Sequence, residues 1–215
     1  MKSILQIVLW IGCIVLGYFI YSSINAPIKF NKVREERFSA IIDNLKDIRD
    51  SQEAYKAVNG KYTSDFNSLI KFIDTGSYTI TQQRDTSFLY YDKSFQIDLQ
   101  KDSILIDTLG FVKVKDSLFK GDNRYKKMMN VPYAKNGEKF KLAAEIKDNK
   151  GYSSPVFEAS VLKNVVLYDQ PKDLVEKENA HNSVEEINDS IIKVGSLDAV
   201  STNGNWPAIY DRKKN

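Results

Sequence analysis

The strongest constraint on this chain is a run of 21 residues without a charge, from Ile4 to Ile24. A helix rises about 1.5 Å per residue, so the run reaches about 30 Å, the thickness of the hydrocarbon core of a bilayer. Three aromatic residues near its end, Tyr18, Phe19 and Tyr21, suit a membrane–water interface. The run therefore predicts one transmembrane helix near the N-terminus.

Two other interpretations of this run fit the sequence less well. A cleaved signal peptide is expected to have a shorter apolar core and small residues at its cleavage site, and YSSINAP is a poor site. A lipoprotein signal would use Cys13, but Trp10 lies three residues before it and the apolar run continues to Ile20. An uncleaved single-pass anchor fits best.

The residues that flank the run point to two different orientations. Four basic residues at positions 29, 32, 34 and 37 favour a cytoplasmic C-terminus by the positive-inside rule. A short N-terminal tail is instead typical of a signal anchor, and large domains cross membranes largely regardless of charge. We expect the anchor in the inner membrane of a bacterium and the C-terminal domain in the periplasm.

A second helical pattern follows the anchor. Asn25-Ala26-Pro27 is expected to break or kink the helix just beyond the membrane. From about Asn31 to Val58, apolar residues then recur at three- and four-residue spacing. This stripe can pack against the chain's own sheet or against a sister helix in a coiled coil; we expect the former, because Gln52 interrupts the seam. The stripe includes Phe38, Ile41, Leu45 and Ile48.

The stretch QEAYKAVNGKYTSDFNSLIKFI predicts a corner at the end of this helix. Gly60 suits the left-handed position that ends a helix. Thr63 or Ser64 can cap a second, shorter helix, and Tyr55 and Tyr62 bracket the turn and can pack across it. The apolar face of the second helix comprises Phe66, Leu69, Ile70 and Ile73.

The hydrophobic period changes to that of strands after Gly76. Five short β-rich runs (SYTITQQ, SFLYYD, FQIDLQ, SILIDTL and FVKVKDSLF) are separated by DKS, QKD and LG, which predicts an antiparallel meander. EKFKLAAEI and PVFEASVL predict a second hairpin, which NVVLYD extends. The fold class is therefore α+β: an N-terminal transmembrane helix, then a long amphipathic helix packed on an antiparallel sheet of about five to seven strands.

Composition shifts divide the chain into four regions. Residues 1–27 form the transmembrane anchor and kink, 28–75 a helical stem with its corner, 76–170 the antiparallel β domain, and 171–215 an acidic segment with an aromatic tail. The acidic part, from 172 to 190, is expected to be a solvated periphery. Trp206 and Tyr210 either fix the tail to the domain or dock a partner.

No motif for catalysis or for a cofactor is found in this sequence. Phosphate-binding, nucleophile-elbow and zinc-protease patterns are all missing, and one cysteine with one histidine cannot build a Cys/His metal cluster. A net charge of +3 is too small to indicate nucleic acid. We therefore predict no enzyme activity, no catalytic, cofactor-binding or metal-binding residues, no cofactor, no nucleic-acid partner and no small-molecule substrate.

Other polar and aromatic residues have simpler explanations than a site. His181 lies among acids and is expected on the surface. The aromatic group Phe88, Tyr90, Tyr91 and Phe95 is explained by packing across a hairpin. Solvent-facing positions on the sheet are expected for Asp98, Asp102 and Asp107.

The order of these features resembles type IV pilins and the pseudopilins of type II secretion. Those proteins often have a Tyr, a Gly-x-Tyr and a Leu-containing stretch where the long helix meets the globular head. Tyr55, Gly60, Tyr62 and Leu69 match this pattern, and the resemblance covers residues 4–73. The Gly-Phe-(x)3-Glu processing site of the family has no counterpart here, so the resemblance implies the shape of a pilin and not its processing.

These observations predict a single-pass membrane-anchored structural or assembly component of a bacterial envelope machine, pilus-like or belonging to a secretion or gliding-motility apparatus. It would act by protein–protein contacts, with the membrane, other envelope proteins and copies of itself as partners. The alternative is a tethered extracytoplasmic domain that binds a ligand or acts as an enzyme. The candidate partner contacts are Phe38, Ile41, Leu45, Ile48, Trp206 and Tyr210.

Overall fold

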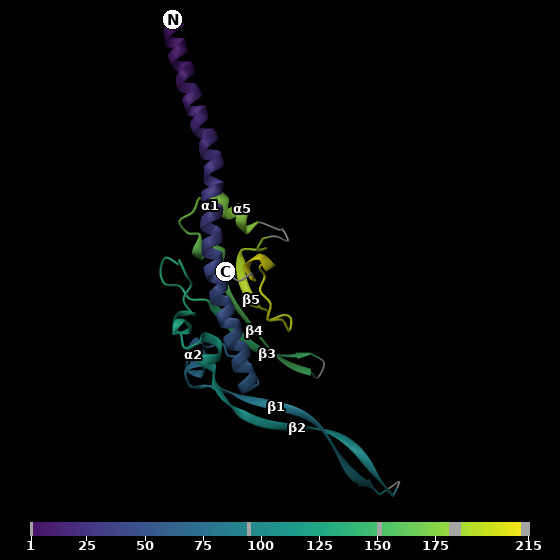
Figure 1. Ribbon diagram of the computed structural model, residues 1–215. Helices are drawn as coiled ribbons and strands as arrows, with labels where there is room; N and C mark the ends of the chain where they lie inside the picture. Colours follow the sequence, from purple (N-terminus) through teal and green to yellow (C-terminus); the bar gives the residue numbers. More distant parts are fainter. Residues whose placement is uncertain (1, 94–95, 150–151, 181–185, 212–215) are drawn as a thin grey trace.

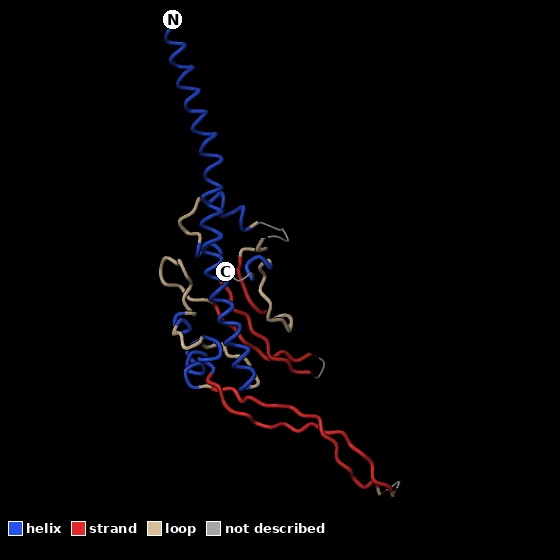
Figure 2. Tube along the Cα trace, viewed as in Figure 1, coloured by secondary structure: helices blue, strands red, loops and turns tan. Residues whose placement is uncertain are grey.

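A computed structural model describes residues 2–93, 96–149, 152–180 and 186–211. The described chain is α+β, with one very long helix and two separate antiparallel sheets (Figures 1 and 2). In chain order the elements are α1 (Lys2–Asn59), α2 (Phe66–Thr75), β1 (Ser77–Asp92), β2 (Ile97–Lys113), α3 (Val114–Phe119), η1 (Arg124–Lys127), β3 (Lys141–Asn149), β4 (Tyr152–Leu162), α4 (Lys163–Val166), α5 (Lys172–Asn179), β5 (Ile191–Gly195) and η2 (Ala208–Asp211).

Helix α1 is unbroken over 58 residues, which corresponds to about 87 Å. Pro27 lies inside it, so the predicted break is wrong. A proline removes one backbone hydrogen bond and costs a helix interior about 3 kcal/mol. That cost is offset because the helix is already held by the domain three residues later, where Phe30 is buried.

The two parts of α1 differ in their surroundings. The N-terminal part could span a membrane by its length and composition, and its most apolar stretch has no buried residue. Beyond Phe30 the apolar stripe is buried, and Leu45 and Ile48 are fully covered. Helix α1 contacts both β4 and β5 of the three-stranded sheet. The interpretation that the stripe packs on its own domain is therefore confirmed.

The corner after α1 has the predicted termination but a different cap. Gly60 is left-handed, with φ +72°, and its N–H donates to the carbonyl of Lys56 at 2.8 Å. Helix α2 is capped by Asp65, whose carboxylate accepts the N–H groups of Asn67 and Ser68, so the prediction of Thr63 or Ser64 is wrong. A carboxylate has two oxygens and can satisfy both of these free helix N–H groups.

Three side chains hold this corner in place. The buried Gln52 amide donates to the Thr63 carbonyl at 2.6 Å and accepts the Thr63 N–H at 3.1 Å, which explains a polar residue in the apolar seam. The Tyr55 ring packs edge-on against Phe72 of α2. Tyr62 instead meets Phe157 of β4, with ring centroids 4.6 Å apart.

The first group of strands is one long hairpin and not a meander. Strands β1 and β2 pair over their whole length, from Ser77↔Lys113 to Asp92↔Ile97, with one bulge between Ile80 and Thr81. Of the three predicted turns, QKD and LG lie inside β2. QKD pairs with β1 without interruption, whereas Leu109 of LG is the extra residue of the bulge, because Gly110 pairs with Ile80 and Thr108 with Thr81. The last six residues of FVKVKDSLF form helix α3.

The second group of strands forms a sheet of its own, in the order β3-β4-β5. The predicted hairpin of β3 and β4 is confirmed. NVVLYD does not extend it, because Lys163 begins helix α4 and β5 pairs with β4 up to Leu162. A single sheet of five to seven strands is thus wrong for the described residues, which form a two-stranded and a three-stranded sheet.

The C-terminal region is less peripheral than its composition suggests. In α5, Val175 and Glu178 are buried, and Ile187 is buried after it. Trp206 is 8% exposed and its indole N–H donates to Asp211 at 3.2 Å. The predicted surface position of His181 lies outside the described residues, as does Phe95.

Candidate functional site: a charged groove and an exposed arm

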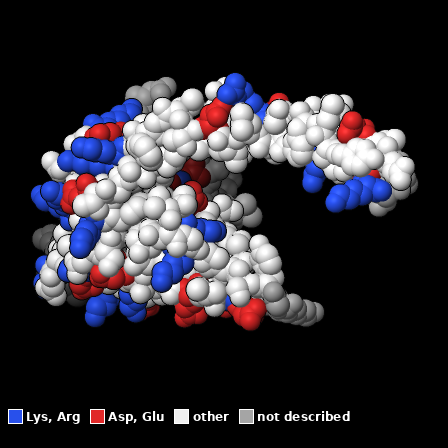
Figure 3. All heavy atoms as spheres, turned by 90° about the horizontal axis from the view of Figure 1, so that it is seen from below, with Lys and Arg blue, Asp and Glu red and all other residues white. Residues whose placement is uncertain are grey.

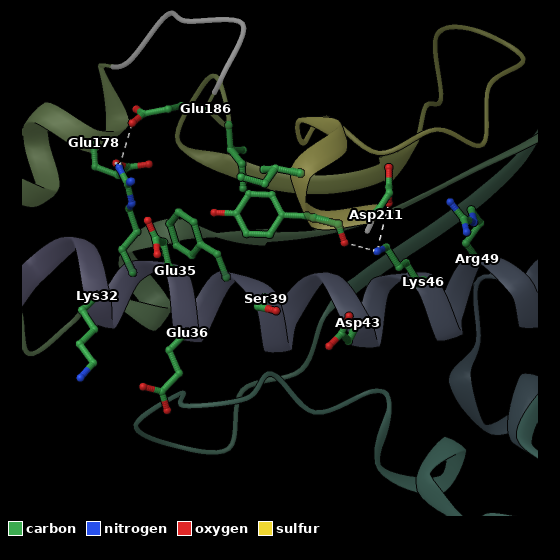
Figure 4. Close-up of a pocket in the computed structure, with 15 residues that line it drawn as sticks. Lys32, Glu35, Glu36, Ser39, Asp43, Lys46, Arg49, Glu178, Glu186 and Asp211 are labelled. Carbon is green, nitrogen blue, oxygen red and sulfur yellow. Dashed lines mark hydrogen bonds and ion pairs between the residues drawn. The ribbon is translucent and has the colours of Figure 1, made fainter. Parts of the chain in front are cut away.

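Two features of the described surface have the character of a site. One is a groove between α1 and the C-terminal region, with a volume of about 1020 Å³ (Figure 4). The other is the β1–β2 hairpin, called the arm below (residues 77–113), which leaves the body at the end of α1 opposite the apolar segment (Figure 1). The groove is lined mainly by charged side chains, whereas the arm exposes large apolar ones.

The groove is lined along α1 by charged side chains that face the loops opposite. Figure 4 shows Glu35, Ser39 and Lys46 on the helix, with Glu178 and Asp211 on the far wall. Ligand pockets are mostly apolar with a few polar groups, whereas this lining carries both signs of charge. Its lining therefore suits a charged or zwitterionic molecule better than an apolar one.

One end of the groove rests on a buried ion cluster. The ammonium group of Lys163, which is fully buried, donates to the carboxylate and the carbonyl of Glu178, both at 3.0 Å, and to the carbonyl of Ile187 at 2.7 Å. Arg34 of α1 donates to the same carboxylate at 2.6 Å. Buried charges are tolerated only when they are paired and hydrogen-bonded, and this cluster meets both conditions. The cluster therefore fixes α4, α5 and the backbone at Ile187 to α1.

A second arginine of α1 fixes the loop after α4. The Arg37 guanidinium donates to both carboxylate oxygens of Asp169, at 2.6 and 2.8 Å, and to the carbonyl of Val166. These hydrogen bonds favour the ionised carboxylate and lower the pKa of Asp169 below its ordinary range. The geometry is the bidentate fork that makes arginine–carboxylate pairs specific.

The other end of the groove is closed by the C-terminal tail. Lys46 lies 3.0 Å from the carboxylate of Asp211 and donates to the carbonyl of Tyr210 (Figure 4). Tyr210 is partly buried, and this burial raises the pKa of its hydroxyl. The tail is therefore fixed to α1 at this end of the groove.

The six predicted partner contacts lie against the protein's own domain. Phe38, Ile41, Leu45 and Ile48 are exposed by 1% or less, so a sister helix has no access to them in this structure. Trp206 is buried and Tyr210 packs on the core. Among the described residues, no group of three or more His, Cys, Asp or Glu side chains could hold a metal ion.

The arm is the feature that analysis of the sequence missed. It is a two-stranded ribbon, most of whose strand residues are exposed and none of which is buried, and such a ribbon alone is only marginally stable in water. Eleven large apolar side chains on it are between 40% and 72% exposed. They are Ile80, Phe88, Leu89, Tyr90, Tyr91, Ile97, Ile104, Leu105, Ile106, Leu109 and Phe111.

The charged residues of the arm face solvent or one another. Asp98 and Asp102 are exposed, as predicted. Asp107 is partly covered because Arg84 forms an ion pair with it across the two strands. Figure 3 shows the arm extending sideways from the body, with charged side chains sparser along it than on the body.

A signal for the arm was present in the sequence. Residues 77–92 and 97–113 contain no proline, and their only glycine is Gly110. Two long stretches without strong breakers favour two long strands over several short ones.

Comparisons with protein-family models, with curated proteins and with solved structures each find no match.

Proposed function

We propose that this protein is a single-pass membrane-anchored structural or assembly component of a bacterial envelope machine, such as a pilus-like, secretion or gliding-motility apparatus. Its domain would lie in the periplasm and act by contacts with other envelope proteins. The observation that carries the proposal is the arm, which presents large apolar side chains at the end of α1 opposite the apolar segment.

The exposed apolar surface of the arm supports a binding role. Contiguous apolar patches beyond a few hundred Å² are uncommon on monomeric soluble proteins and typically mark interaction sites. A partner that covers the arm would remove these side chains from water and stabilise an otherwise marginal ribbon. The pilin-like order of anchor, long helix and corner agrees with this role.

The geometry of α1 supports a protein partner for the arm. From residue 28 to 59 the helix spans about 48 Å. With residues 4–24 in a bilayer, the arm would begin at that distance from the membrane surface, far beyond the lipid headgroups. Its apolar side chains would therefore meet other proteins.

Removal of the arm tests this proposal. A variant that replaces residues 82–107 with Asn-Gly, between the paired Thr81 and Thr108, would close the hairpin early and leave the body intact. Ser39→Arg, which fills part of the groove, is the matched control. Envelope proteins recovered with the detergent-solubilised wild type should also be recovered with the control and be lost with the armless variant. Equal recovery with the armless variant would contradict the proposal.

The groove supports a second candidate, a tethered ligand-binding domain. Its volume of about 1020 Å³ is large enough for a metabolite, and its lining would suit a polar ligand with charges of both signs. A zwitterionic metabolite that raises the melting temperature of the wild type but not of Ser39→Arg would favour this candidate. Without such a ligand, the role of the arm is the better-supported proposal.

A further inference from the structure

The two strands of the arm have different free edges. Each strand pairs with the other along one edge and leaves its second edge without a strand neighbour in the described structure. Along β1 the central stretch, residues 82–87, reads QQRDTS and is entirely polar. Along β2 the central stretch Ser103-Ile104-Leu105-Ile106 has neither a charge nor a proline, although these devices usually protect free edges.

We propose that the free edge of β2 pairs with the same edge of a second copy of this chain, antiparallel and centred on Ile104. The inference deepens the proposed function and rests on it, because it names one partner of the arm. An antiparallel pair of identical strands has two-fold symmetry, so each contact occurs twice. In this register, residues whose numbers sum to 208 lie opposite each other.

Charge complementarity supports this register. Lys101 of each copy lies opposite Asp107 of the other, which gives two opposite-charge pairs, and no like charges are opposed between residues 100 and 108. Asp107 already pairs with Arg84, and a carboxylate has acceptor sites for a second cation. A shift of the register by two residues would lose both Lys101–Asp107 pairs.

Apolar burial supports the same register. Ile104 faces its own symmetry mate, and Ile106 lies diagonal to it on the same face of the ribbon. The two copies of Leu105 lie diagonal to each other on the opposite face. Ile104 is 59% exposed, Ile106 58% and Leu105 48%. Pairing would therefore bring together apolar surface that the single chain leaves in water.

The placement of the arm is compatible with two copies in one membrane. Figure 3, viewed approximately along α1, shows the arm extending sideways from the body. A two-fold axis parallel to α1 would place both anchors in the same bilayer and point the two arms in opposite directions. Both arms would also lie at the same distance from that bilayer, because the two α1 helices are identical in length.

Cysteine cross-linking of the full chain in native membranes tests the register. Cys13, the single cysteine, is first replaced by alanine. Ile104→Cys should then form a disulfide-linked dimer under mild oxidation, because directly opposed residues have Cα atoms about 4.5–5.5 Å apart. Asp85→Cys is the matched control: it is paired with Ile104 within the arm and on the same face, yet its symmetry mate would lie about 14 Å away.

A charge reversal provides a second, independent measurement. Lys101→Glu in the Ile104→Cys background would place a carboxylate opposite Asp107 at both symmetry-related positions. The repulsion should lower the dimer yield at least about threefold. The proposal is overturned if Ile104→Cys stays monomeric, if Asp85→Cys cross-links as efficiently, or if Lys101→Glu changes nothing. A monomeric Ile104→Cys chain that still recovers other envelope proteins would overturn the pairing alone and leave the proposed function standing.

Discussion

Replacing Lys163 with methionine would measure what the buried ion cluster contributes to the fold. Methionine keeps most of the length of the side chain and removes its charge. Glu178 would keep its 2.6 Å contact with Arg34, but its other carboxylate oxygen and the carbonyls of Glu178 and Ile187 would lose the hydrogen bonds that Lys163 donates. The substitution therefore removes three hydrogen bonds from acceptors in a buried cluster.

The expected cost follows from burial. Breaking a buried ion pair from one side typically costs about 3–5 kcal/mol, and Lys163 and Glu178 are 0% and 3% exposed at their side chains. Lys193→Met is the matched control, because Lys193 lies at the same 3.0 Å from Glu158 but is 38% exposed. Exposed pairs contribute about 0–1 kcal/mol, so this variant should stay close to the wild type.

Thermal unfolding of the detergent-solubilised full chain, followed by near-UV circular dichroism, would compare the two variants. At about 2–4 °C per kcal/mol for a chain of this size, Lys163→Met should lower the melting temperature by about 6–20 °C. Lys193→Met should lower it by no more than about 4 °C. Equal shifts for the two variants would refute the reasoning that burial decides the value of the pair.

Three further predictions concern the core, the tail and pH. Leu45→Ala should cost about 2–5 kcal/mol and Leu45→Asp should unfold the domain, because Leu45 is fully buried; a folded Leu45→Asp chain that only loses oligomers would instead indicate a coiled coil. Trp206→Ala should lower the melting temperature by several degrees, and an unchanged melting temperature with weaker partner binding would identify a docking residue. Burial, together with its hydrogen bond to Asp74, raises the pKa of Tyr125 to about 12, so its contribution to stability is present below pH ~10 and is lost as the pH rises toward ~12. Between about pH 9.5 and 11.5 the free energy of unfolding should fall less for Tyr125→Phe than for the wild type. Equal decreases in the two proteins would contradict the assignment to Tyr125.

Local features of this protein could be predicted from the sequence. The apolar segment, the amphipathic stripe around Leu45 and the end of α1 at Gly60 depend on residue spacing and backbone preferences within a few turns. The β3–β4 hairpin follows from two short alternating runs that are close in sequence. In each case, the interactions that form the element lie within the segment that predicts it.

Features that depend on distant segments were decided by the tertiary structure. Pro27 stays inside α1 because the domain fixes the helix beyond it. The turn signals QKD and LG do not reverse the chain, because β1 pairs with β2 over its whole length, and LG produces only a bulge at Leu109. The two long strands of the arm could be predicted from their lack of breakers, but the exposure of the arm could not, since it depends on what the rest of the chain leaves uncovered. The groove and its ion cluster likewise join Arg34 to Glu178 across 144 positions, and only packing of the C-terminal region on α1 brings these two charges to 2.6 Å.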